Sequence, residues 1–481
     1  MRLCLISLLF SFTIASGAAI RTGFPALNVR LTTPLTSYDS AKGSEFRCVV
    51  IAPYVVDGRV VLPLGTTVIG TVRQTKGVGL GIKRERASIQ LAFHHYELSD
   101  GARYPMVGVL RQIDNARESV TDSGQIKGIL AANNPQSLLH GVWHRPRLVH
   151  FSKSFIGLTG AGGKIFTSYS MGPMGAASLF AIRLALFRLP EPEIQLPAGT
   201  DMRIAIKQLP PDAPSYVAPE SESVSSDLAD WLSNQVIEVT KPGGEKAEDL
   251  INLAFEGSRE ELDNAFRSAG WFKAESLNTR TFARAYQSYT RQTGYSQAPV
   301  SRLLYRGADP DAVYQKSLNT ISKRHHIRLW RVVNDGREFW LGAATHDVGV
   351  RMKKKTMSFT HKIDPRIDLE RSKVANDLLF SGCAEAPRFV ERPGTARAGD
   401  GSKAIVTDGD LAYIALRACL PPAEMEPDVP TPPKSRLARI ARRMMLEGRQ
   451  YALRGNAYYW TYRAVTFHRS SAKQARALLE E

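Results

Sequence analysis

A β-hairpin with a strong turn signal is the feature that most limits how this chain can fold. Residues 324–333 are typical of one strand, Asn334-Asp335-Gly336 favours a tight turn, and residues 337–345 supply the return strand. Successive side chains of a strand point to opposite faces, so His325 and His326 are separated by the sheet. We therefore expect one histidine to face a core and the other to face a polar environment.

The hairpin and the segment after it concentrate side chains that can bind metals or transfer protons. Of the ten histidines in the chain, four lie between positions 325 and 361. Two imidazoles with one or two carboxylates suit zinc, manganese or iron and leave a position open for water. The candidate metal ligands are His346, Asp347, His361 and Asp364, which lie on or at the ends of neighbouring predicted strands.

Charged residues around the hairpin are candidates for catalysis, because a metal-activated hydroxide beside an acid or base would make the site hydrolytic. The candidate catalytic residues are His326, Arg328, Asp368, Glu370 and Arg371, with Asp368 or Glu370 as the acid or base. Metal-free acid–base catalysis is a second interpretation. A third is a structural polar network, in which Asp368 pairs with Arg371 at helical spacing and Arg328 meets a carboxylate.

The first half of the chain is typical of β-structure. Between 27 and 207, short runs rich in β-branched residues alternate with Gly and Pro, which predicts a barrel-like or sandwich domain over 20–208. The pattern Leu-Pro-x-Gly-Thr occurs at 62–66 and again at 196–200. Through these turns and Leu35-Thr36-Ser37, residues 27–207 resemble the small β-barrel domains of TrbI-type conjugation and secretion proteins.

Proline-rich segments divide the rest of the chain. A linker at 209–228 separates the β-rich domain from a domain at 229–420, and a second linker at 421–434 precedes a tail at 435–481. The order of elements between the linkers mixes helices with strands. The predicted fold class is therefore multidomain, with an all-β domain followed by an α+β domain that contains an antiparallel meander.

Local signals predict individual elements of the α+β domain. Ser258 and Glu261 have the spacing of a capping box at the start of a helix. Asp364, which precedes a proline, is expected to be the N-cap of another helix. Strands are expected at 300–305 and at 356–363, and the second of these would complete the meander.

Several motifs of the α+β domain occur together in a known family. They are His-His-x-Arg-x-Trp at 325–330, Phe-Trp-Leu-Gly-Ala-Ala at 339–344, His346-Asp347, the run from His361 to Arg371, the stretch from Asp249 to Leu253, Ala269-Gly270-Trp271 and Ala298-Pro299-Val300. Over about 229–420 the sequence resembles the LssY C-terminal domain. That family is named for a component of a secretion system, so the resemblance implies a type of domain more than a reaction.

The N-terminus has the pattern of a secretory signal. An apolar segment follows a basic residue and ends in small residues, so we expect residues 1–19 to be removed on export to the periplasm or the outer membrane. In that oxidising compartment Cys383 and Cys419 are expected to form a disulfide. Cys48 would then remain as a buried strand thiol.

Positive charge is concentrated in the tail. The formal net charge is +17, and from Lys434 to the end eleven Lys and Arg stand against three Glu. Apolar residues recur there at helical spacing, at Leu437, Ile440, Ala441, Met444 and Met445. A basic amphipathic helix of this kind favours a membrane surface or acidic lipid as partner, ahead of nucleic acid for an exported chain. Docking of the helix on the protein's own core is the other interpretation.

Two functions are compatible with these features. The first is an exported cell-envelope protein that has a binding or structural role at a membrane or with secretion-system proteins. The alternative is an envelope hydrolase, with a divalent metal or without one, that acts on a phosphoester or ester through the His and Asp residues of 325–371. Export and the basic tail favour the first function, and the clustering of rare titratable residues favours the second.

Overall fold

The computed structural model describes most of the chain between 26 and 420. The described residues are 26–79, 85–115, 117–129, 192–217, 223–276, 294–319, 323–353, 358–392 and 405–420, with a few single positions and pairs besides. The predicted signal at 1–19 and the linker at 421–434 lie outside them, as does the tail at 435–481 except for three helical positions.

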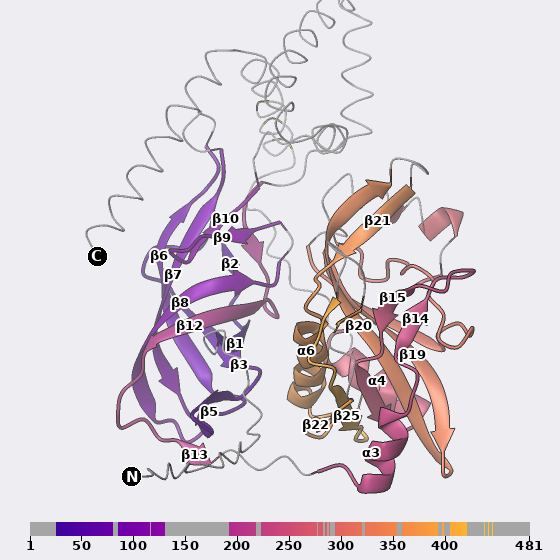
Figure 1. Cartoon of the computed structure of the whole chain (residues 1–481). Helices are drawn as coiled ribbons and strands as arrows, with labels where there is room; N and C mark the ends of the chain where they lie inside the picture. Colours follow the sequence, from indigo (N-terminus) through magenta and orange to yellow (C-terminus); the bar gives the residue numbers. More distant parts are fainter. Residues whose placement is uncertain are drawn as a thin grey trace, which may run out of the picture.

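The N-terminal β-rich domain is a closed barrel of six strands among the described residues, which confirms the predicted class (Figure 1). The strands pair in the order β6 (Thr67–Lys76), β3 (Glu45–Val50), β1 (Ala26–Leu31), β12 (Asp201–Gln208), β8 (Arg103–Ile113) and β7 (Ser88–Glu97), and β7 pairs with β6 to close the ring. Alternate side chains point inwards and fill the core, as Leu27, Val29 and Leu31 do on β1.

Short strands accompany the barrel. They are β2 (Leu35–Thr36), β4 (Tyr54–Val56), β5 (Arg59–Leu62), β9 (Ser119–Val120), β10 (Gln125–Lys127), β11 (Gln195–Leu196) and β13 (Tyr216–Val217). The two Leu-Pro-x-Gly-Thr turns precede β6 and β12, and their glycines Gly65 and Gly199 have φ angles of 85° and 87°. An L side chain is strained at such angles, so glycine is required in both turns.

The second domain is built on one sheet. Its strands run in the order β17 (Phe272–Lys273), β18 (Ala312–Ser317), β19 (Arg324–Asn334), β20 (Arg337–Lys353), β16 (Leu253–Glu256), β25 (Leu411–Ala415) and β22 (Arg388–Val390), and β21 (Ser358–Ile363) also pairs with β20. Strands β19 to β21 form the predicted antiparallel meander, and β18 extends it by a strand that was not predicted from the sequence. The pair β16 and β25 is parallel.

Smaller elements complete the described part of this domain. They are the two-stranded ribbons β14 (Glu238–Thr240) with β15 (Ala247–Leu250) and β23 (Arg397–Ala398) with β24 (Ile405–Val406), and the helices α3 (Ser226–Ser233), α4 (Arg259–Ser268) and α6 (Ile367–Phe380). Helices α4 and α6 cover one face of the sheet around Ile327 and Leu329. Helix α3 packs on the other face, near Trp330. The central strands are therefore buried on both sides.

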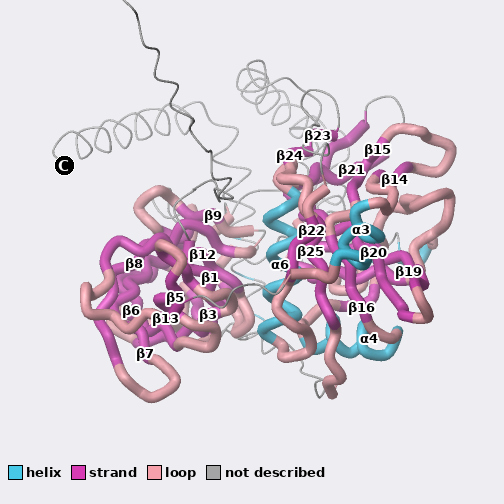
Figure 2. The backbone as a smooth tube through the Cα atoms, turned by 60° about the horizontal axis from the view of Figure 1, so that its bottom comes forward, coloured by secondary structure: helices cyan, strands magenta, loops and turns pink. Residues whose placement is uncertain are grey.

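Helix α6 lies between the sheet and the barrel. Figure 1 places it on the side of the second domain that faces the barrel, and the turned view of Figure 2 agrees. Its residues Val374 and Leu378 pack into the sheet core. Its residues Lys373 and Asp377 contact Asp201 and Arg30 of the barrel. One helix thus serves an apolar core and a charged interface.

Several local predictions are confirmed and others are wrong. Ser258 and Glu261 form the predicted capping box of α4. The helix after Asp364 begins at Ile367, with Arg366 at its N-cap, so Asp364 is not the cap. Its carboxylate instead accepts a hydrogen bond from the backbone N–H of Arg366 at 3.1 Å. Residues 300–305 do not form a strand. Only Leu304 and Tyr305 form isolated bridges, with Thr240 at the end of β14 and with Ala308.

No helix among the described residues is both long enough and apolar enough to cross a bilayer.

The predicted disulfide between Cys383 and Cys419 is present, and Cys48 is buried in the barrel core as expected.

The disulfide predicts a measurable stabilisation. It closes a loop with a sequence separation of 36 residues. Closing such a loop lowers the entropy of the unfolded chain, which raises the free energy of unfolding by about 3–4 kcal/mol. In Cys383→Ser/Cys419→Ser, the free energy of unfolding of the second domain, measured with guanidinium, should therefore be lower by that amount, and the unfolding midpoint should shift to lower denaturant. A reductant should destabilise the natural chain but leave the double variant unchanged. Equal unfolding midpoints for the two proteins would contradict the prediction.

Candidate functional site

The β19–β20 hairpin places titratable residues on both faces of the sheet. Its register pairs His325 with His346, and His326 with Thr345. His325 and His326 point to opposite faces as predicted, but both are buried, at 4% and 3% exposure. The expectation that only one of them meets polar groups is wrong, because each ring lies beside a carboxylate.

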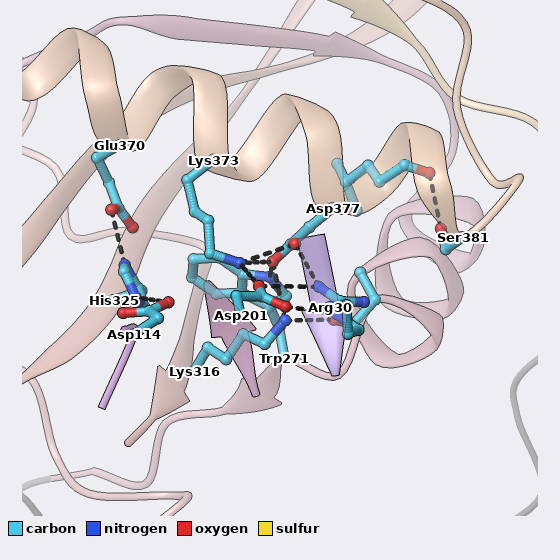
Figure 3. Close-up of polar contacts among 12 residues, drawn as sticks. Arg30, Asp114, Asp201, Trp271, Lys316, His325, Glu370, Lys373, Asp377 and Ser381 are labelled. Carbon is cyan, nitrogen blue, oxygen red and sulfur yellow. Dashed lines mark hydrogen bonds and ion pairs between the residues drawn. The ribbon is translucent and has the colours of Figure 1, made fainter. Parts of the chain in front are cut away.

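On the α6 side, His325 lies between two carboxylates that come from different domains (Figure 3). Its Nδ1 is 2.7 Å from Glu370 Oε2 on α6, and its Nε2 is 2.8 Å from Asp114 Oδ2, directly after β8 of the barrel. The ring of His346 stacks on that of His325 with centroids 4.3 Å apart. We call Asp114, His325, His346 and Glu370 the histidine cluster.

The two imidazoles of the histidine cluster have different protonation states. Burial alone would lower the pKa of His325, but the charges of Asp114 and Glu370 outweigh it and raise that pKa to about 10. Burial and the positive charge of His325 lower the pKa of His346. At neutral pH, His325 is therefore a cation between two anions, and His346 is neutral.

A second group of charges lies further along the same face of α6 (Figure 3). It consists of Arg30, Asp201, Lys316, Lys373 and Asp377, which we call the interdomain ion cluster. Asp377 is fully buried and is 2.8 Å from both Arg30 and Lys373. Its other oxygen also accepts a hydrogen bond from Lys316 at 3.0 Å. Three cations thus share two carboxylates across the domain interface.

The opposite face of the hairpin carries a network of its own. Arg324 donates to Asp347 at 3.0 Å, and His326 Nε2 is 3.3 Å from the same carboxylate. Arg328 donates to Asp249 at 3.2 Å. We call these five residues the hairpin network.

Burial lowers the pKa of His326 to about 4 despite the charge of Asp347, and burial raises the pKa of Asp249 to about 6 despite the charge of Arg328.

The remaining predicted catalytic residues hold a loop. Arg371 donates to both oxygens of Asp408 at 2.7 Å. Asp368 accepts hydrogen bonds from the hydroxyl of Thr407 at 2.7 Å and from the backbone N–H of Asp408 at 2.8 Å. Arg371 also lies 3.5 Å from Asp368, as its helical spacing predicted. These contacts fix the segment that leads into β25.

The predicted metal ligands do not share one face of the sheet. His346 and Asp347 are neighbours on β20, so their side chains point apart, and Asp347 belongs to the hairpin network. The carboxylate of Asp364 pairs with Arg366. His361 lies on β21, and its side chain is outside the described positions. His346 and Asp347 therefore cannot bind one ion from the same face of the sheet.

The predicted catalytic residues are likewise distributed over separate sites. His326 and Arg328 lie in the hairpin network, Glu370 lies in the histidine cluster, and Asp368 and Arg371 hold the loop. The structural interpretation expects Arg328 to pair with a carboxylate and Asp368 to pair with Arg371. Both contacts are present.

The barrel residues of both clusters were not indicated by the sequence pattern. Asp114 and Asp201 come from strand ends far from the hairpin in the chain, and nothing local distinguishes them. A signal did exist on α6, where Glu370, Lys373 and Asp377 recur at helical spacing. A charged stripe on a helix that also carries a core face predicts a buried polar interface.

Removal of one carboxylate from the interdomain ion cluster should destabilise the protein strongly. In Asp377→Asn, three partly buried cations would face Asp201 alone, and such uncompensated charge costs about 3–5 kcal/mol. Chemical denaturation measures the loss. The control is Asp309→Asn, which removes a carboxylate that pairs with Arg302 on the surface, and it should unfold as the natural chain does. Equal stability of the two variants would contradict the role given to Asp377.

Lys316 predicts an alkaline pH dependence. Burial and the positive charges of Lys373 and Arg30 lower the pKa of Lys316 to about 8. The negative charge of Asp377 offsets this effect only in part. Since a lysine in the unfolded chain titrates near 10.4, the unfolded state binds more protons between these values, and stability rises with pH there. The natural chain should gain up to roughly 3 kcal/mol over Lys316→Met between about pH 8 and pH 10.4. A constant difference across this range would contradict the assignment.

Comparison with known proteins gives one assignment. A search of the curated proteins found no match. A scan against protein-family models matched residues 233–411 to the family described as LssY C-terminus. The matched segment contains the β19–β20 hairpin, α6 and the hairpin network. This match confirms the resemblance predicted from the motifs, over residues 233–411.

Proposed function

We propose that this chain is an exported cell-envelope protein with a binding or structural role, in which the barrel and the LssY C-terminal domain act as one body. The observation that supports this role is how the titratable residues of α6 are used. Lys373 and Asp377 pair with Arg30 and Asp201 of the barrel, and Glu370 shares His325 with Asp114. These charges pair with one another across the two domains.

The proposed partner is a membrane surface rich in acidic lipid, either alone or with secretion-system proteins. The tail supplies the support, because three apolar residues at helical spacing, Leu437, Ala441 and Met445, are exposed. Leu437 is 78% exposed and Met445 is 52% exposed. Exposed apolar side chains on a basic helix can insert between lipid headgroups. Eleven basic residues from Lys434 onwards add attraction to an anionic surface.

Vesicle binding tests the proposed partner. The mature chain should sediment with vesicles of phosphatidylethanolamine and phosphatidylglycerol, and should be released as salt rises, because screening weakens the electrostatic attraction. Leu437→Glu/Met445→Glu should reduce binding about tenfold or more, since it removes two inserted side chains and adds two negative charges. The control is Val217→Glu, which changes a 75% exposed valine of the barrel domain. Equal binding by both variants would exclude the tail as the lipid contact.

Export is tested by the mass of the mature chain. Produced in a secretion-competent bacterium, the natural chain should be recovered from the envelope without its first 17 to 19 residues. Leu8→Arg/Leu9→Arg interrupts the apolar segment of the signal. We expect this variant to keep its full length and to remain in the cytoplasm. Recovery of the natural chain at full length in the cytoplasm would overturn the proposed location.

An envelope hydrolase remains as a second candidate because of one arrangement. Asp114, His325 and His346 each offer a ligand atom, and these atoms lie within 4.8 Å of one another. A metal ion held there would have two imidazoles and a carboxylate, a donor set that suits activation of a water molecule. The substrate of such an enzyme would be a phosphoester or an ester.

A further inference from the structure

The histidine cluster has the geometry of a metal site assembled from both domains. Asp114 comes from the barrel, and His325 and His346 come from neighbouring strands of the LssY C-terminal domain. We infer that these three side chains bind a divalent transition-metal ion, best fitted by zinc, and that Glu370 positions His325 for it. This inference is independent of the membrane role proposed above, and it uses the same three ligands as the hydrolase candidate.

The first two ligands are already close to the separation that zinc requires. The Nε2 atom of His325 is 2.8 Å and 3.0 Å from the two oxygens of Asp114. Two ligand atoms of a tetrahedral zinc, each about 2.0–2.1 Å from the metal, are about 3.3 Å apart. A shift of a few tenths of an ångström therefore admits the ion between them.

Glu370 holds His325 in the orientation of a metal ligand. Its Oε2 accepts from Nδ1 at 2.7 Å, which leaves Nε2 directed at Asp114. Histidine ligands of zinc commonly donate their second ring N–H to a carboxylate, which fixes the ring and makes the ligand nitrogen more basic. Glu370 is a positioning residue in this arrangement, because it contacts the ligand and not the ion.

Two buried polar atoms of the cluster have no hydrogen-bond partner among the residues that the structure describes. They are Nε2 of His346 and Oε1 of Glu370, and each is almost completely removed from solvent. An unpaired buried polar atom costs about 1–3 kcal/mol, so such atoms call for an explanation. Coordination by His346, after a rotation of its ring, would satisfy its free nitrogen. The side chain of Asp114 is 16% exposed, which gives an ion a route from solvent.

Proton balance distinguishes the two states of the cluster. Without a metal, both nitrogens of His325 donate to carboxylates, so the ring carries two protons. When the ion binds, the Nε2–H bond breaks, the nitrogen lone pair coordinates the ion, and the proton leaves to solvent. The Nδ1–H bond to Glu370 is retained. Two imidazoles and a single carboxylate favour zinc over magnesium, which prefers oxygen ligands.

Zinc binding by the untagged, purified mature chain tests the site. After dialysis against micromolar zinc, the natural chain should retain about one zinc per chain by inductively coupled plasma mass spectrometry, and magnesium should not compete. Asp114→Asn and His346→Ala should reduce zinc to background. Glu370→Ala should weaken the affinity about 10–100-fold, whereas Glu370→Gln should largely restore it, because the amide oxygen still accepts from Nδ1.

The control removes the other close histidine pair of the described residues. His94 and His95 lie on the barrel with their Nδ1 atoms 2.7 Å apart, and His94→Ala/His95→Ala should retain full zinc. Zinc should also raise the melting temperature of the natural chain and of this control, and a chelator should reverse the rise. This second readout holds if His346→Ala fails to fold. Absence of stoichiometric zinc in the natural chain, or unchanged binding in Asp114→Asn, would overturn the site.

Discussion

The buried carboxylate of Asp377 is the group on which the joint between the two domains depends. A charge taken out of water costs several kcal/mol unless partners of opposite charge and hydrogen-bond donors surround it. Asp377 obtains donors from its own domain through Trp271 and Lys316. Arg30 of the barrel completes the set, and Arg30 is itself held by Asp201. Helix α6 can therefore bury this face only when the barrel is docked.

The motifs that identify the family are mainly structural in this fold. Trp271 donates its indole N–H to Asp377 at 3.0 Å, and Asn252 bonds both backbone groups of Ala344 through its side-chain amide. Ala298 and Pro299 offer backbone carbonyls to Arg324. These residues satisfy buried charges or replace missing strand pairs. A polar residue in a sheet that is buried on both faces needs specified partners, which gives these motif residues a structural role.

The local elements were predictable from the sequence, whereas the convergence of the charges was not. The turn at Asn334-Asp335-Gly336 and the alternation around it fix the hairpin register, so the separation of His325 from His326 could be predicted. The same alternation already placed His346 and Asp347 on opposite faces, and the predicted metal set overlooked it. Asp114 and Asp201 lie 211 and 176 residues from His325 and Asp377 in sequence. Only the docking of the barrel brings them to α6, and no local pattern encodes that docking.

The position of His325 favours a positive charge between the domains. Asp114 and Glu370 approach it from opposite sides, and a cation between two buried carboxylates keeps both of them in the charged form. A proton on the imidazole supplies that charge in one state, and a metal ion on the same nitrogen supplies it in the other. Either cation bridges the barrel to α6, so the same geometry that joins the domains also prepares the ligands of the ion.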